Sequence, residues 1–281
     1  MHIKQNRKNG FSLIELSIVM AISGVLLAGF LQFYSATQQK KQYDTTKQRL
    51  SGIRTALTLY VITHGNLPCP ASPSGDYSAD QCANGSDPMP GVKRYNIDPR
   101  AYLPSADGRD DVWTGILPMK ELRFDSEQIQ DGWGNEFTYA VSRRLTFRNS
   151  MKGNPLPLGI ISVVDENGNS LLDKPNTSRY VIVSHGSTGA GAWIPGGGRK
   201  PCAENTLDGK NCLGLNVFVV APVSKQPGKN FYDDIVIHDD QNAGGALLEL
   251  LAICNTKQGF YEPLNPYADQ DGCILARQRL R

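Results

Sequence analysis

The chain has 281 residues, of which 40% are hydrophobic and 20% are charged, which is typical of one globular domain plus an N-terminal segment. The formal charge of +2 depends on Lys4, Arg7 and Lys8, since the first ten residues hold no acidic residue. Without those ten residues, the 29 basic residues fall by three to 26, against 27 acidic ones. The sequence therefore lacks the concentrated basic charge of most nucleic-acid-binding domains and does not support nucleic acid as a partner.

Six cysteines follow the apolar N-terminal segment, and their even number predicts disulfide bonds, because oxidising compartments keep such pairs closed. No C-x-x-C motif is present, so the sequence does not support a zinc ribbon or a thioredoxin-like site. Fifteen pairings are formally open, and the sequence-local one closes three short loops worth about 2 to 3 kcal/mol each. Its pairs are Cys69–Cys82, Cys202–Cys212 and Cys254–Cys273.

Residues 16–39 form a run of 24 residues without a charge. A helix of that length covers about 36 Å, which is enough to span a bilayer core. A secretory signal peptide is one alternative, but its apolar region is usually about 7 to 15 residues long, and no A-x-A-like site precedes Lys40. A plain membrane anchor is the other alternative, since the positive-inside rule places the basic N-terminus in the cytoplasm.

Glu15 places a carboxylate inside the apolar stretch, where an unpaired charge costs several kcal/mol and a partner is expected. The segment from Lys4 to Glu15 reads KQNRKNGFSLIE and resembles the leader of type IV prepilins and pseudopilins. The resemblance implies that a prepilin peptidase cuts after Gly10 and methylates the new N-terminal residue, Phe11. It also implies that Glu15 meets the N-terminal amine of a neighbouring subunit.

A second helical pattern follows the apolar run. Five apolar residues with spacings of three, four, three and one lie on one helical face: Leu50, Ile53, Leu57, Tyr60 and Val61. Glycine and proline then discourage further helix within the segment HGNLP, residues 64–68. A membrane half followed by an amphipathic half laid on a sheet is also the plan of the family that the leader resembles.

We therefore expect four parts in this chain. Residues 1–10 are a cleaved leader, and residues 11–39 are a hydrophobic transmembrane and assembly helix. Residues 40–64 are the amphipathic half of that helix, and residues 65–281 are a soluble α+β domain.

In this α+β fold the long helix packs on one face of an antiparallel β-sheet. Residues 65–135 are rich in Pro, Gly, Asp and Ser and are expected to form long, disulfide-stapled loops with little regular structure. Short β-like runs separated by turns follow at residues 136–141, 158–164, 179–184, 215–221 and 235–238.

Two further features resemble the same family. Residues 131–135 read DGWGN and, with Tyr139 after them, are similar to the D-x-W-G-N turn and aromatic strand of pseudopilins. The resemblance also suggests that Cys254 and Cys273 bound the disulfide loop of many pilins.

A calcium site is one interpretation of the oxygen-bearing side chains that alternate after residue 164. They are Asp165, Asn167, Asn169 and Asp173. The pattern departs from a calcium loop, because Ser170 and Asn176 replace the expected glycine and bidentate glutamate. Asn-Gly at 167–168 is an equally good hairpin turn, so we favour the turn and predict neither a metal nor another cofactor.

The histidines offer no recognisable catalytic or metal site. His64, His185 and His238 show neither H-E-x-x-H nor a paired metal spacing. A triad of Ser184, His185 and Asp239 is conceivable, yet no serine lies in a G-x-S-x-G motif. We therefore predict that the chain is not an enzyme.

Two other segments invite a chemical interpretation. Residues 186–198 are dense in glycine but lack the G-K-[ST] of a phosphate loop, so we expect a flexible loop. Asp233 and Asp234 precede a β-like run, and we expect them to lie solvated at a strand end rather than to act as an acid and base.

The leading functional hypothesis is a minor pilin or pseudopilin that assembles through its N-terminal helix into a type IV pilus-like or type II secretion fibre. The resemblance implies as partners a prepilin peptidase, other pilin or pseudopilin subunits and an inner-membrane assembly platform. It also implies a single-pass protein of the bacterial inner membrane, with a cytoplasmic N-terminus and a periplasmic soluble domain, which then joins a periplasmic or surface fibre.

A tip adhesin or DNA-uptake module on such a fibre is the alternative hypothesis. DNA binding would need an exposed basic and aromatic patch. The nearest candidates are Lys93, Arg94 and Tyr95, and Arg143, Arg144 and Arg148. Such clusters are more often solvated faces.

Overall fold

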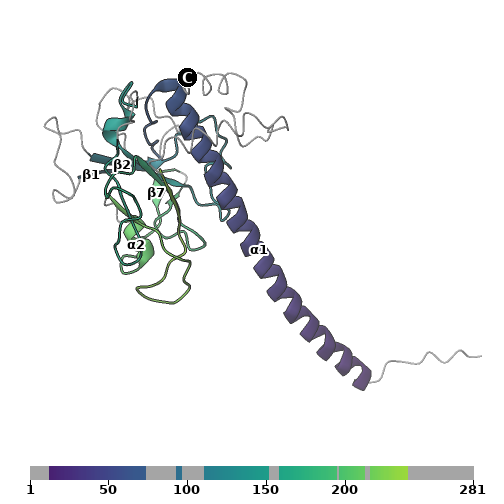
Figure 1. Ribbon diagram of the computed structural model, residues 1–281. Helices are drawn as coiled ribbons and strands as arrows, with labels where there is room; N and C mark the ends of the chain where they lie inside the picture. The colour runs from purple at the N-terminus through teal and green to yellow at the C-terminus, as the bar shows by residue number, and fades with distance from the viewer. Residues whose placement is uncertain are drawn as a thin grey trace, which may run out of the picture. The chain divides into compact units, whose positions relative to one another are not determined.

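The computed structural model describes residues 13–73, 93–96, 111–151, 158–194, 196–212 and 216–239. Its elements run from one long helix to a series of short strands (Figure 1). The chain divides into two compact units, residues 1–44 and residues 45–281. The first unit contains the apolar part of the helix, and the second contains the rest of the helix and the strands.

Helix α1 runs from Leu13 to His64 without a break, over 52 residues. The next residue, Gly65, has a φ of 75°, and its N–H donates to the carbonyl of Val61 at 2.8 Å. Glycine adopts this left-handed conformation readily, and it closes the C-terminal end of many helices. The helix end predicted from the glycine and proline after His64 is therefore confirmed.

The central sheet has five antiparallel strands in the order β1-β2-β3-β5-β9. They are β1 (Lys93–Asn96), β2 (Asp111–Ile116), β3 (Thr138–Ser142), β5 (Tyr180–Ser184) and β9 (Ile235–His238). Strands β3, β5 and β9 lie within or beside runs that the sequence predicts as strands. The α+β class with a helix on an antiparallel sheet is therefore confirmed.

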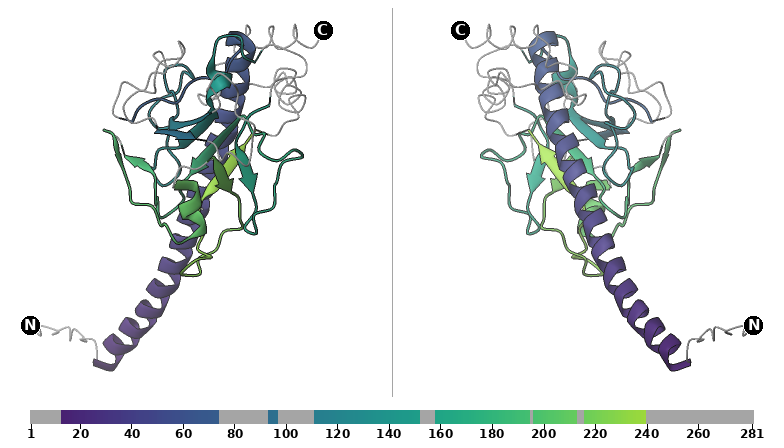
Figure 2. Two further views of the ribbon diagram at one scale, coloured as in Figure 1. Left: turned by 90° about the vertical axis from the view of Figure 1, so that its left-hand side faces the viewer. Right: turned by 90° about the vertical axis from the view of Figure 1, so that its right-hand side faces the viewer.

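One face of the sheet packs against the second half of α1, and Figure 2 shows this part of the helix passing along the sheet. Leu50, Ile53 and Leu57 are buried there with the sheet residues Trp113 and Tyr139. Burying one such aliphatic side chain contributes about 1.5 to 3 kcal/mol relative to leaving it exposed. The helical face predicted from the apolar spacing is the face that packs on the sheet.

The opposite face of the sheet is covered by a separate pair of strands. β4 (Ser162–Val164) pairs in parallel with β8 (Val217–Val219), and Val163 and Phe218 join a core cluster with Val181 of the sheet. The sequence predicts strands in both regions but assigns them to the antiparallel sheet, which is wrong. Parallel pairing joins segments that are distant along the chain, so local patterns do not reveal it.

Strand β2 corrects the prediction that residues 65–135 hold little regular structure. Its six residues are all buried, and it pairs with β1 on one side and with β3 on the other. The strand reads DVWTGI, and four of its six residues (Val, Trp, Thr and Ile) favour strands, but the run is short and lies in a stretch rich in Gly, Pro and Asp. Pairing with two neighbours, rather than a long apolar run, makes this segment a strand.

The glycine-dense segment 186–198 also differs from the expected flexible loop. It contributes β6 (Trp193–Ile194), which forms a hairpin with β7 (Gly198–Arg199). Gly191 has a φ of 85°, and a side chain there would collide with Cys212. Glycine is therefore required at this position by close packing. The remaining elements are the 3-10 helix η1 (Arg143–Thr146) and the short helix α2 (Leu207–Cys212).

The cysteines give a mixed outcome. Cys202 and Cys212 form a disulfide, with their Cα atoms 5.8 Å apart, as the sequence-local pairing predicts. Cys69 is a buried free thiol, so the structure does not support its predicted bond to Cys82. Cys82 itself and the predicted pair Cys254–Cys273 lie outside the described residues.

Candidate functional site

The apolar half of α1 presents its side chains to the surroundings. The large apolar side chains between Leu13 and Tyr34 are exposed. Among the described residues, α1 is the one helix that is long and apolar enough to cross a membrane. Soluble proteins rarely expose so large a continuous apolar surface, so lipid or neighbouring helices are the expected environment.

Glu15 lies in the first turn of α1 and is exposed. An acidic side chain is favourable at this end of a helix, because the unsatisfied N–H groups there carry partial positive charge. The predicted cleavage residues Gly10 and Phe11 lie outside the described residues, so the structure leaves their predicted pairing with Glu15 as a prediction.

The polar and small residues of this half suit an apolar environment. The hydroxyl of Ser17 donates to the carbonyl of Ile14 at 2.8 Å, and that of Thr37 donates to Phe33 at 2.9 Å. Both hydroxyls are thus bonded inside their own helix, as lipid requires. A side chain at Gly24 or Gly29 would meet no atom within 4 Å, which leaves these positions open to a closely packed neighbouring helix.

The DGWGN turn is organised by the buried carboxylate of Asp131. Its Oδ1 accepts hydrogen bonds from the backbone N–H groups of Trp133 and Asn135, both at 2.9 Å. Its Oδ2 accepts one from the Ser184 hydroxyl at 2.7 Å. Burial raises the pKa of Asp131, and these hydrogen bonds oppose that rise. The turn is therefore fixed to the end of β5 through a single side chain.

The same turn is also bonded to the domain half of α1. The N–H of Gly132 donates to the Thr46 hydroxyl at 2.8 Å. The Arg49 guanidinium donates to the carbonyls of Gln130 and Asp131, at 3.0 and 3.2 Å. This turn, which the sequence singles out, therefore joins the sheet to the second half of helix α1.

The weak calcium candidate forms the hairpin turn favoured from the sequence. Asp165 Oδ1 accepts hydrogen bonds from the N–H groups of Asn167 and Asn169, at 2.9 and 2.8 Å, and its Oδ2 accepts one from the Asn169 side chain at 2.9 Å. These bonds hold the pKa of Asp165 below its usual value, with the Asn169 side chain as the largest cause. Both oxygens of the Asp165 carboxylate therefore already accept hydrogen bonds from within the turn.

The residues considered for a triad do not combine. Ser184 donates to Asp131, while Asp239 forms an ion pair with Arg179 at 2.7 Å. His185 is fully buried, and its Nε2 is bonded to the Thr138 hydroxyl at 2.8 Å. Each of the three residues therefore bonds to a different partner, whereas a triad needs its three residues linked by hydrogen bonds to one another.

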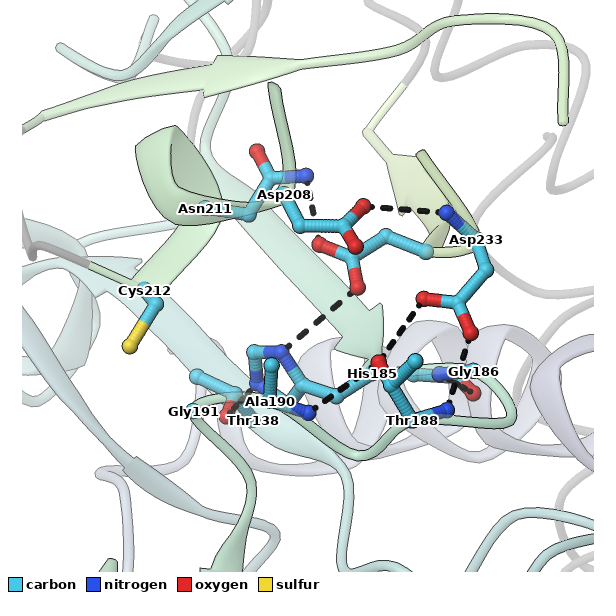
Figure 3. A network of polar contacts seen from close by, with 12 residues as sticks. Thr138, His185, Gly186, Thr188, Ala190, Gly191, Asp208, Asn211, Cys212 and Asp233 are labelled. Carbon is cyan, nitrogen blue, oxygen red and sulfur yellow. Dashed lines mark hydrogen bonds and ion pairs between the residues drawn. The ribbon is translucent and has the colours of Figure 1, made fainter. Parts of the chain in front are cut away.

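Asp233 and Asp234 correct the prediction of a solvated acidic pair. They are only 7% and 4% exposed. Carboxylate oxygens of the two residues and of Asp208, which is 1% exposed, all lie within 4.8 Å of one another. Figure 3 shows Asp208 and Asp233 of this cluster near His185, with Gly186 close to Asp233. Asp208 has no sequence signal of its own, because only the fold brings α2 next to the start of β9.

The arginine cluster considered for DNA binding is also partly buried. The Arg143 guanidinium lies over the ring of Trp113 at 5.0 Å and 3.7 Å from Asp111 Oδ1. It therefore does not form part of an exposed basic patch. The side chains of the other candidates, Lys93, Arg94 and Tyr95, lie outside the described residues.

Comparison with known families identifies the N-terminal segment. A family model described as the prokaryotic N-terminal methylation motif matches residues 5–31. Neither the curated proteins nor the solved structures gave a match. The matched residues contain the KNGFSLIE sequence and run into the exposed apolar half of α1. The chain therefore carries the prepilin-type cleavage and methylation signal of type IV pilin-like proteins.

Proposed function

We propose that the chain is a minor pilin or pseudopilin subunit of a type IV pilus-like or type II secretion fibre. The observation that carries the proposal is the continuity of the methylation motif with helix α1. The motif occupies residues 5–31, and the same helix continues to His64, where its second half forms part of the domain core. A subunit of this design inserts one half of a helix into a fibre and displays a folded domain on the other half.

The chemistry of assembly is then carried by three residues. A prepilin peptidase cuts after Gly10 and methylates the new N-terminus at Phe11. The Phe11 ammonium of one subunit pairs with Glu15 of its neighbour, where a carboxylate among apolar residues needs a positive partner. Pairing stabilises one axial register among apolar helices that otherwise slide freely.

The proposal also gives the chain a place in the cell. Its apolar segment spans the bacterial inner membrane with a cytoplasmic N-terminus, because Lys4, Arg7 and Lys8 precede the span. The domain then lies in the periplasm, and the Cys202–Cys212 disulfide supports such an oxidising compartment. The subunit leaves the membrane through an assembly platform to join other pilins.

The size of the domain supports a low-copy position in the fibre. Residues 65–281 follow the helix, and a domain of that size is bulky for a densely repeated shaft subunit.

Mass spectrometry of the N-terminus tests the proposal. In cells with a prepilin peptidase, we expect the purified chain to begin at Phe11 and to carry one added methyl group. In cells without the peptidase, it should begin at Met1. Gly10→Val should block processing, whereas Asn9→Ala is the neighbouring control and should be processed. An unprocessed N-terminus in peptidase-positive cells would contradict the proposal.

A further inference from the structure

The buried acidic cluster combines residues from three elements. Asp208 belongs to α2, Asp233 and Asp234 directly precede β9, and His185 directly follows β5. All four side chains are more than nine-tenths buried. The fold therefore holds three carboxyl groups together, away from water, and His185 Nδ1 lies 3.7 Å from one of them, Asp234 (Figure 3).

Some oxygens of the cluster already have hydrogen-bond donors. The hydroxyls of Ser187 and Thr188 donate to Asp233, at 2.7 and 3.1 Å, and the N–H of Thr188 donates to it at 2.9 Å. Asp208 Oδ1 accepts from the N–H of Asp233 at 3.0 Å. Asp234 Oδ2 accepts from the Asn211 side chain at 2.9 Å. These bonds orient the carboxyl groups.

Three other atoms of the cluster are buried without a hydrogen-bond partner. They are Asp208 Oδ2, Asp234 Oδ1 and His185 Nδ1. Leaving a buried polar atom unpaired is costly, and most such atoms in folded proteins are paired. His185 Nδ1 lies 3.7 Å from Asp234 Oδ1. Two ligands of a tetrahedral zinc ion lie about 3.4 Å apart, which follows from bonds of about 2.0 to 2.2 Å.

The carboxyl groups of the cluster are buried close to one another, so burial and mutual repulsion disfavour their charged forms. Burial raises the pKa of Asp208 to about 7, and the charge of Asp233 adds to the rise. Burial and the charge of Asp208 raise the pKa of Asp234. Burial, together with the charges of Arg199 and Lys200, lowers the pKa of His185 to about 3. A divalent cation bound among these carboxyl groups would offset their repulsion, and a histidine ring nitrogen is a common metal ligand.

We propose that Asp208 Oδ2, Asp234 Oδ1 and His185 Nδ1 bind a divalent transition-metal ion of the Zn²⁺ type. An imidazole and carboxylates together suit Zn²⁺, whereas Ca²⁺ and Mg²⁺ prefer ligand sets made of oxygens. Thr138 bonds to the other ring nitrogen of His185, and Asn211 bonds to Asp234. Metal-binding residues typically have such supporting partners.

The bound ion ties α2 and the segment before β9 to the end of β5. The Cys202–Cys212 disulfide fixes the far end of α2, so the metal and the disulfide together hold the second half of the domain. This stabilising site does not depend on cleavage at Gly10 or on fibre assembly.

Calorimetry on the full-length protein in detergent, after treatment with a chelator, tests the site. We expect Zn²⁺ to bind with a stoichiometry of about one per chain and to raise Tm by about 5 °C or more at 100 times Kd. Ca²⁺ at the same concentration should leave Tm unchanged. No saturable Zn²⁺ binding, or stabilisation by Ca²⁺ but not by Zn²⁺, would overturn the proposal.

Asp208→Asn keeps the acceptor for the Asp233 N–H and removes the charged ligand oxygen. It should weaken Zn²⁺ binding about tenfold or more, since even supporting partners of a metal site contribute that much. The matched control is Asp165→Asn, an exposed carboxylate in the former calcium candidate, which should bind Zn²⁺ as the wild type does. A loss of binding in Asp165→Asn alone would overturn the assignment.

X-ray absorption at the zinc edge tests the ligands in the wild-type protein, so the proposal does not depend on the variant folding. The spectrum should show one imidazole nitrogen and carboxylate oxygens around the ion. Sulfur in the first shell, or the absence of imidazole, would place the ion elsewhere and refute this site.

Discussion

At the scale of single residues, Glu15 and Asp131 are two carboxylates with opposite surroundings. Glu15 is exposed on an apolar helix, where its charge finds no water once the helix enters lipid or a fibre. Asp131 is buried, and both of its oxygens accept hydrogen bonds from the protein. The first residue is therefore suited to pairing between subunits, and the second to holding one subunit together.

Replacing Glu15 with Ala or Gln should leave cleavage at Gly10 intact and reduce fibre incorporation about tenfold or more. A hydrogen bond to a charged group contributes about 1.5 to 3 kcal/mol, and the loss of 1.4 kcal/mol is tenfold in an equilibrium. Immunoblots of sheared fibre and membrane fractions measure the effect.

Ser17→Ala is the control for Glu15, because the Ser17 hydroxyl donates only within its own helix in the structure and should be dispensable. Normal incorporation of Glu15→Gln would argue against the pairing mechanism while leaving the processing signal untouched.

Asp131→Asn should destabilise the domain by about 1 to 3 kcal/mol. An asparagine preserves the acceptor at Oδ1, but its amide then faces the Ser184 hydroxyl and the Asn135 amide, which both donate to Oδ2 in the wild type. Denaturant unfolding followed by tryptophan fluorescence measures the change. Asp125→Asn is the control, because Asp125 Oδ1 accepts two backbone N–H groups in the same way but the residue is exposed. Equal losses in both variants would contradict this explanation.

At the scale of elements, α1 combines two environments in one continuous helix. Its first half is apolar and exposed, while its second half buries Leu50, Ile53 and Leu57 against the sheet. The DGWGN turn bonds to Thr46 and Arg49 at the start of the second half. The second half of α1 is therefore joined to the sheet both by packed side chains and by this turn.

The disulfide fixes α2, which supplies Asp208 to the buried cluster. Replacing Cys202 and Cys212 with Ser should destabilise the domain by about 2 to 3 kcal/mol, since the bond closes a loop with a sequence separation of 10. Denaturant unfolding measures the change, and an unaltered midpoint would contradict the prediction. Trypsin cleaves after Lys210, between the two cysteines, so a disulfide-linked pair of peptides reports the bond in the wild type.

At the scale of the whole molecule, the methylation motif and the buried acidic cluster lie in different units of the chain. The methylation motif and the apolar helix lie within residues 1–44, and the sheet and the buried acidic cluster lie within residues 45–281. Nothing in the proposed assembly mechanism uses the acidic cluster, and nothing in the cluster depends on the leader. If the proposed function holds, we expect changes to the acidic cluster to leave assembly intact as long as the domain core holds α1.

The sequence by itself determined the helix, the processing signal and strands β3, β5 and β9. These features depend on local patterns: an uncharged run, a short motif, a helical spacing and runs of β-forming residues. The Cys202–Cys212 bond could be predicted for the same reason, because the two cysteines are close along the chain.

Only the tertiary structure decided the position of β2, the parallel pair β4–β8 and the burial of Asp208, Asp233 and Asp234. A short strand among glycines and prolines becomes regular through its neighbours' hydrogen bonds. Asp208 lies 25 residues before Asp233, and it joins the adjacent Asp233 and Asp234 only when α2 and the segment before β9 meet. Burial is set by what covers a residue, and the covering segments come from elsewhere in the sequence.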